Sequence, residues 1–275
     1  MTSTPGPRSP DPSSARASEE PRELHFAEAV ALQDLHTYIR RARRIQEQGV
    51  RLQAVGTVLA AWVPVMTPSS LVGRLPAVLG LRTMALTRSS RADVTVELSA
   101  ITERLARMNP AETVLPLPPS RLSVPWAAVT PPRTGWQPLG ELEDDVVRAA
   151  AEHGIAEIAR TVPETAGAAV VEQVRERVWG RSLAETAAES TAGASTDDVQ
   201  AESAPADPAD GPAASEGTAA SAAAQAVPAG AAFGSHALNF LSPEGSGGRT
   251  AVHGLGRWLR LSSAGGHILC RRTGI

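Results

Sequence analysis

Two long stretches of this sequence contain almost no large apolar side chains, and this restricts which residues can build a core. Residues 1–21 hold five Pro and five Ser, and residues 184–226 consist mainly of Ala, Ser, Thr, Gly, Pro and acidic residues, with Val199 as their only large apolar side chain. Such segments bury too little surface to offset the conformational entropy lost on folding. We predict a disordered tail over residues 1–21 and a disordered, Ala-rich acidic linker over residues 184–226.

The remaining residues, 22–183 and 227–275, are numerous enough for one sizeable core. A folded chain of this size buries about 70% of the surface that the unfolded chain exposes. The C-terminal segment alone is too short for an independent domain without a disulfide or a metal, and the sequence has a single Cys. We therefore expect residues 227–275 to complete the globule that residues 22–183 begin.

The spacing of apolar side chains predicts an α+β fold. Helical periodicity covers residues 22–48, 99–108, 142–160 and 164–180, and a short helix is expected over 229–241. Alternating or β-branched runs predict strands at 50–55, 58–65, 78–86 and 94–98, with Gly56-Thr57 as the first turn. Residues 252–262 and 267–272 form a predicted β-hairpin around the turn 263–266. Short connections between these elements imply an antiparallel sheet with flanking helices.

A Pro-rich segment, residues 112–140, separates the two halves of this pattern. It carries Trp126 and Trp136, and we interpret it as an ordered strap that its indole rings anchor to the globule. If the protein were an enzyme, Arg133 and Trp136 would line a pocket beneath the strap. We favour the simpler interpretation, in which Trp136 packs as an anchor.

No constellation of residues in the sequence indicates catalysis. Cys270 and His267 are three residues apart in a predicted strand, so they point to opposite faces and cannot form a nucleophile–base pair locally. The six His residues show no metal-ligand spacing with Cys or carboxylates, and the Gly254-Leu-Gly256 run lacks the third glycine of a dinucleotide-binding loop. We predict no catalytic residues, no metal and no cofactor, and we lean toward a function without an enzymatic reaction.

The sequence also lacks the features of membrane and secreted proteins. No apolar run approaches the ~20 residues that a membrane helix needs, and the first residues have no apolar signal segment. One Cys excludes a disulfide scaffold. We expect a cytoplasmic protein that makes no contact with a membrane.

Charge is distributed unevenly along the chain. Residues 184–226 carry eight acidic residues and no Arg, whereas residues 227–275 carry five Arg and one acidic residue. These basic residues are Arg249, Arg257, Arg260, Arg271 and Arg272. The planar fork of Arg suits phosphate and carboxylate, so they are candidate contacts to an anionic partner. The acidic linker either competes for them as an intramolecular anion or only keeps an Ala-rich segment soluble.

A second basic run, Arg40-Arg41-Ala-Arg43-Arg44, lies within the first predicted helix. It resembles a nucleic-acid tract, but Arg43 can pair with Glu47 one turn later, and we interpret the run as a solvated helix face. The leading functional hypothesis is therefore a cytoplasmic protein that acts by binding a macromolecule, with a protein as the expected partner. The alternative is a protein that binds RNA or DNA through the basic C-terminal hairpin and is regulated by the acidic linker.

Several short runs occur in a characteristic order. They are Phe26-Ala-Glu-Ala-Val-Ala-Leu-Gln-Asp-Leu35, Ala60-Ala-Trp62-Val, Leu79-Gly-Leu-Arg-Thr83, Pro131-Pro-Arg-Thr-Gly-Trp136, Val178-Trp-Gly180, Ala231-Ala-Phe233 and Gly256-Arg-Trp-Leu-Arg-Leu261. In this order the chain resembles a family of conserved actinobacterial proteins of unknown function. The resemblance spans most of the residues expected to fold. It implies a high-GC actinobacterial source, but no activity, since none of the runs is a motif of known chemistry.

Overall fold

A six-stranded antiparallel sheet runs through the computed structural model, which describes residues 21–68, 75–194 and 213–271. Its strands are β2 (Val50–Met66), β3 (Ala77–Val96), β5 (Gln137–Glu143), β6 (Arg249–Leu255), β7 (Trp258–Ser263) and β8 (Gly266–Arg271). Their order in the sheet is β2-β3-β8-β7-β6-β5. Residues 77–81 pair with residues 267–271, so strands from the first and last parts of the sequence join in one sheet. A separate pair forms between β1 (Glu23–His25) and β4 (Val114–Pro116).

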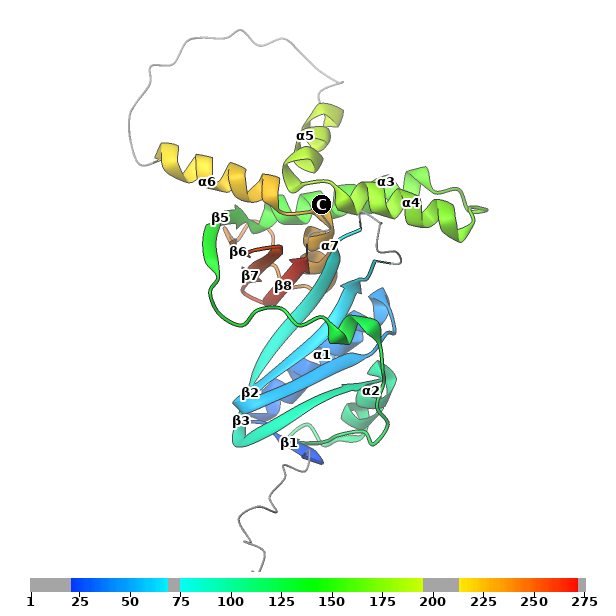
Figure 1. Ribbon diagram of the computed structural model, residues 1–275, viewed down its shortest axis with the longest axis vertical. Coiled ribbons are helices and arrows are strands. Elements are labelled where there is room, and N and C mark those ends of the chain that lie inside the picture. Colours follow the sequence, from blue (N-terminus) through cyan, green and yellow to red (C-terminus); the bar gives the residue numbers. More distant parts are fainter. Residues whose placement is uncertain (1–20, 69–74, 195–212, 272–275) are drawn as a thin grey trace, which may run out of the picture.

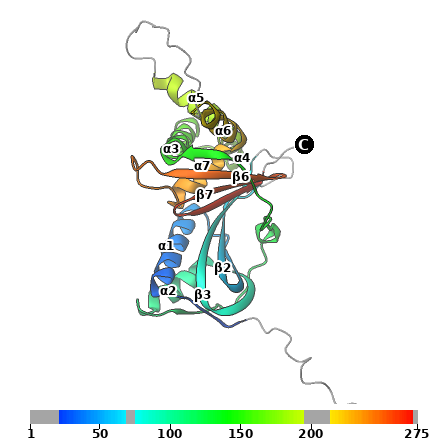
Figure 2. The same cartoon turned by 90° about the vertical axis from the view of Figure 1, so that its left-hand side faces the viewer.

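Helices flank this sheet, and the larger of two hydrophobic clusters, the larger core, lies between the helices and the sheet. They are α1 (Ala29–Ile45), α2 (Leu98–Arg107), α3 (Asp144–Thr161), α4 (Ala168–Gly180), α5 (Leu183–Ala194), α6 (Ala213–Ala226) and α7 (Ala229–Ala237). Figure 2 shows α1 and α2 on one side of β2 and β3, with the short green 3-10 helix η1 (Pro125–Ala128) on the other side. The predicted α+β class, an antiparallel sheet with flanking helices, is confirmed. Within the described residues, no helix is long and apolar enough to cross a lipid bilayer.

The first helix begins later than predicted. Residues 23–25 form β1 and pair with β4, and Phe26 bridges to Leu86, so α1 starts only at Ala29. Leu24 and Phe26 are both buried. They alternate with Glu23 and His25, a period of two that belongs to a strand. The prediction of a helix from residue 22 was wrong because Leu24 also fits the helical period.

The four strands predicted over residues 50–98 are two long strands that form one hairpin. Gly56 does not turn the chain back: with φ at 62° it lies inside β2, at a shift in register. Gly56 pairs with Ser90 but Val58 pairs with Ala85, so β3 carries a bulge opposite this point. The left-handed conformation that glycine allows serves turns and bulges equally, and local sequence could not separate the two.

The predicted linker, residues 184–226, is helical at both ends. Residues 195–212 lie outside the described residues, as do residues 1–20 of the predicted tail. Helix α6 packs against β5, with Ala223 fully buried. At Gly140, where φ is 143°, a Cβ atom would lie 2.7 Å from the carbonyl oxygen of Ala219. Disorder was therefore the wrong prediction for these ends, because small residues let the Ala-rich helix approach the strand closely.

The C-terminal hairpin is present as β7 and β8, and β6 precedes it as a third strand. The strand predicted over residues 252–262 is divided by a turn at Gly256, whose φ is 57°. The predicted strap crosses the sheet on the face away from α1. In Figure 1 its green trace runs from η1 to β5 in front of the strands, whereas α1 lies behind them.

Candidate functional site

Four of the five tryptophans of the sequence lie on one face of the sheet, opposite the face that α1 and α7 cover. Trp62 and Trp126 are buried there with three Leu side chains, and Trp136 and Trp258 are half-buried against this cluster. Four polar side chains share the surface. We define the tryptophan face as Trp62, Trp126, Trp136, Trp258, His253, Arg260, Ser262 and His267.

Strand register explains why these residues share a face. Directly paired residues of neighbouring antiparallel strands point to the same side of the sheet. One such row runs Ser262, His267, Leu81 and Trp62. A second row runs His253, Arg260, Leu269 and Leu79, and a third joins Leu255, Trp258 and Arg271. The alternate residues Val252, Leu259, Leu261 and Ile268 face the helices and are buried in the larger core.

Arg260 and Trp136 meet on this face. The guanidinium carbon of Arg260 lies 5.0 Å from the centroid of the Trp136 ring, within the range of a cation–π contact. The Trp136 indole N–H donates to the carbonyl of Pro132 at 3.2 Å, which fixes the ring. This cation–π contact places the Arg260 guanidinium over the Trp136 ring.

Three buried nitrogen atoms of this face have no hydrogen-bond partner among the residues that the structure describes. They are Nε of Arg260, Nδ1 of His253 and Nε1 of Trp62. Arg260 and Trp62 can only donate. Buried polar atoms are almost always hydrogen-bonded in folded proteins. The two donors on this surface, from Arg260 and Trp62, would be satisfied by a ligand that supplies acceptors.

The charged neighbours of the two histidines are cations. Burial, followed by the positive charge of Arg260, lowers the pKa of His253. Burial also lowers the pKa of His267, helped by Arg260, Arg82 and His253. The ring nitrogen Nδ1 of His267 lies 3.0 Å from Oγ of Ser262. Burial, reinforced by the positive charges around them, thus keeps both imidazoles neutral at pH 7.

The arginines predicted from the sequence occupy different positions. Arg260 lies at the centre of the tryptophan face, and Arg271 is exposed beside Trp258 in the paired strand. Arg257 is exposed in the turn between β6 and β7. Arg249 lies 3.9 Å from Glu141 and 4.0 Å from Glu143, so its charge is balanced. Arg272 lies outside the described residues.

The strap residues singled out as pocket candidates separate. Trp136 is half-buried under Arg260, whereas Arg133 is exposed and its charge helps to lower the pKa of Asp93, after the larger effects of the Arg51 and Gln53 side chains. Cys270 is fully buried and pairs with Leu259 and Val78 in the larger core, while His267 lies on the tryptophan face. These two residues therefore point to opposite faces, as their spacing predicts.

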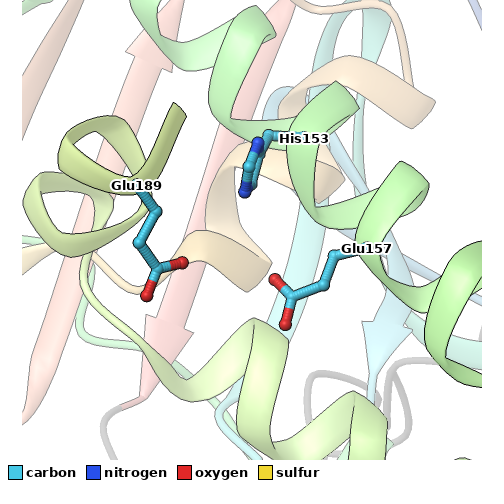
Figure 3. A group of neighbouring side chains, drawn as sticks. All are labelled: His153, Glu157 and Glu189. Carbon is cyan, nitrogen blue, oxygen red and sulfur yellow. The ribbon is translucent and has the colours of Figure 1, made fainter. Parts of the chain in front are cut away.

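A possible metal-binding group lies elsewhere, on the helices. His153 and Glu157 of α3 and Glu189 of α5 offer ligand atoms that lie within 4.8 Å of one another. Figure 3 shows the three side chains. The guanidinium of Arg181, however, donates to both carboxylates, and Arg177 lies 3.8 Å from Glu157. A metal ion would have to displace the cation that already neutralises the pair. We therefore interpret this group as an ion-pair network that stabilises the packing of α5 against α3.

Sequence reasoning missed five of the eight residues of the tryptophan face. His253, Trp258, Ser262 and His267 were not singled out as a group, and Trp62 was assigned only to a strand. A signal was present in Trp258-Leu-Arg-Leu-Ser262, where aromatic and polar residues alternate with leucine. This period of two assigns the polar set to one face of a strand.

The fold and the site define an α+β protein with an aromatic, electropositive sheet face. Residues 131–194 and 182–275 match the family model described as a domain of unknown function, DUF8185. Because this match covers more than half of the sequence, the chain belongs to that family. Residues 19–127 match a second model, the domain of unknown function DUF8010. No curated protein and no solved structure matches the chain.

The two matched regions meet in the site. Trp62 and Trp126 come from the first region, and Trp136, Arg260 and His267 come from the second. The pairing of β3 with β8 joins them in one sheet. The matches agree with a family of unknown function, whereas an actinobacterial source and a cytoplasmic location stay predictions.

Proposed function

We propose that the protein binds single-stranded nucleic acid on the tryptophan face and catalyses no reaction there. The observation that carries the proposal is Arg260, stacked on Trp136 with a buried N–H donor that no acceptor of the described residues meets. This is the alternative among our sequence-based hypotheses. It is favoured over a protein partner by the chemistry of the face.

The polar atoms of the face require acceptors and negative charge. Arg260 and Trp62 bring donors, and the charged groups that act on His253 and His267 are cations. Phosphate oxygens and base carbonyls are acceptors, and Arg binds phosphate with two parallel hydrogen bonds. A protein partner would have to place carboxylates opposite Arg260 and Arg271 to achieve the same balance.

The aromatic rings of the face favour ligands with planar groups that can stack on them. Trp136 and Trp258 are half-buried, so part of each ring remains open to solvent. Base–aromatic stacking contributes about 1–3 kcal/mol per base and tolerates any sequence. The ring faces of bases are available in single strands but are covered by neighbours in a duplex. The combination of indole rings and neighbouring arginines therefore fits a single strand.

The test is the binding of a fluorescently labelled oligonucleotide of about 12 nucleotides, within the usual site size of such surfaces, followed by anisotropy at low salt. We expect Trp258→Ala to weaken binding about 5- to 150-fold, as the loss of one stacked base implies. Arg260→Ala should weaken binding and also reduce the dependence of affinity on salt, because a phosphate contact is lost.

Arg249→Ala is the matched control. Arg249 also lies in the C-terminal three-stranded part of the sheet, but Glu141 and Glu143 already neutralise its charge. Its affinity should equal that of the unmodified protein. The proposal is wrong if the full chain binds no single strand at low salt, or if Arg249→Ala and Arg260→Ala weaken binding equally. Preference for a duplex of the same sequence would also contradict it.

A further inference from the structure

A second electropositive surface lies on the other side of β2 and β3, between α1 and α2. An open hollow of about 410 Å³ is lined there by His36, Arg40, Arg43, Arg44 and Glu47 of α1 and by Thr102 of α2. Figure 2 shows both helices on the side of the strands away from η1, which carries Trp126. The hollow is therefore separate from the tryptophan face.

The lining residues of α1 share one side of the helix. Residues 40, 43 or 44, and 47 follow residue 36 at intervals of three or four, which places the set on one side of the helix along its axis. Arg41, which is not part of this set, instead donates to the carbonyl of Leu238 at 3.5 Å. The basic run that the sequence suggested to be a solvated helix face is thus divided. Three of its arginines converge on the hollow and one points elsewhere.

The positive charges in the hollow are only partly balanced. Arg43 donates to Oε1 of Glu47 at 3.1 and 3.3 Å. For Arg40 and Arg44, the described residues provide no ion pair and no hydrogen bond. Like charges four residues apart on a helix repel each other and destabilise it. An anion bridging these two guanidinium groups would remove this repulsion.

We propose that this hollow binds the di- or triphosphate group of a small anion. Arg40 and Arg44 lie one turn apart, so each can offer its fork to a different phosphate group of the same ligand. The Thr102 hydroxyl already donates to the carbonyl of Leu98 at 2.7 Å, and it lies at the α2 wall of the hollow. Glu47 also lines the hollow, and its negative charge is offset by its ion pair with Arg43.

His36 completes the lining without adding charge. Burial, and next the charge of Arg40, lower the pKa of His36, so its ring is neutral at pH 7 and retains one N–H donor. The ligand is thus held by arginine charge and by one neutral donor. Nucleoside triphosphates and inorganic polyphosphates share the phosphate chemistry recognised here.

The test is isothermal titration of the full chain with inorganic tripolyphosphate and, in parallel, with ATP at low salt. We expect both to bind. The double variant Arg40→Gln/Arg44→Gln should lower the affinity for both ligands at least about tenfold, because charge-assisted hydrogen bonds are lost. Gln retains a long side chain and a good helix propensity. Tighter binding of ATP than of tripolyphosphate would show that the nucleoside also contacts the helices.

Two controls separate this site from others. Arg107→Gln removes an exposed arginine at the end of α2 that lies 3.7 Å from Glu103, and it should leave binding unchanged. Arg260→Gln alters only the tryptophan face, so the part of the tripolyphosphate binding that depends on Arg40 and Arg44 should remain. The proposal is overturned if neither ligand binds, if the double variant binds like the unmodified chain, or if Arg260→Gln abolishes binding instead. Thermal melting of each variant establishes that it is folded.

Discussion

Replacing Asp144 by alanine should lower the free energy of unfolding by about 3 kcal/mol. The substitution removes two charge-assisted hydrogen bonds, and the desolvation cost of the buried carboxylate, which is removed with them, offsets part of this loss. Asp144 opens α3 and is only 1% exposed. Its carboxylate accepts from the Thr250 hydroxyl at 2.6 Å and from the Ser242 backbone N–H at 2.8 Å. The substitution leaves that N–H without its acceptor. In a chain of this size the melting temperature should fall by roughly 6–12 °C.

The adjacent Asp145 provides a matched control. Both residues lie in the first turn of α3, so Asp145→Ala loses the same interaction with the helix dipole. Asp145 is more exposed; it accepts from the Gly245 N–H at 3.0 Å and lies 3.6 Å from Arg148. Its removal should cost about 1 kcal/mol or less. Thermal and urea unfolding followed by circular dichroism measure both variants. Equal losses would show that the buried network around Asp144 does not hold the loop that precedes β6.

Three further predictions follow from the packing and the charges. Gly140→Val should separate α6 from β5, because the added Cβ meets the Ala219 carbonyl, and hydrogen exchange of residues 218–226 should become faster. Gly56→Ala adds a Cβ with nothing within 4 Å and should leave this exchange unchanged. Protection of residues 218–226 retained in Gly140→Val would refute the prediction. Because the pKa of His267 is lowered in the folded state, protonation of His267 destabilises the unliganded fold as the pH falls below the usual value of 6.5. Bound phosphates favour the protonated form, so oligonucleotide affinity should rise from about pH 7.5 to 5.5, and the rise should be smaller in His267→Gln, which retains His253; a flat profile in the unmodified chain would contradict this. Deleting residues 195–212 should tighten binding at low salt if their carboxylates compete for the tryptophan face; unchanged affinity would leave them only a solubilising role.

The sequence predicted the fold class and most helices because these depend on local periodicity. Leu98 to Arg107 and Asp144 to Thr161 were placed within a few residues of their observed bounds. The errors arose where one local signal serves two structures. Gly56 marks a bulge rather than a turn, and Leu24 fits a helical period although it lies in a strand. The helix α6 needed knowledge of its tertiary partner, the surface around Gly140.

The candidate site was predicted only in parts. Trp136 and Arg260 were singled out separately, one as an anchor and one as an anion contact, and nothing local indicates that they meet. Their contact depends on the path of the strap over the sheet and on the register of β7 against its neighbours. Trp62 lies in β2 and joins them only because β2 pairs with β3, and β3 pairs with β8. The strands β3 and β8 are far apart in the sequence. Such long-range pairing leaves no signature in the spacing of one sequence.

The most direct test of the tryptophan face uses the indole N–H signals in a proton–nitrogen NMR spectrum. The sequence has five tryptophans, and Trp179 serves as an internal reference because it is buried on the helical side, 4.9 Å from the ring of Phe233. Titration with a short single-stranded oligonucleotide should shift the signals of Trp136, Trp258 and Trp62 and leave that of Trp179 in place. No shift in the first three, or an equal shift in Trp179, would show that the ligand does not bind where the structure assigns it.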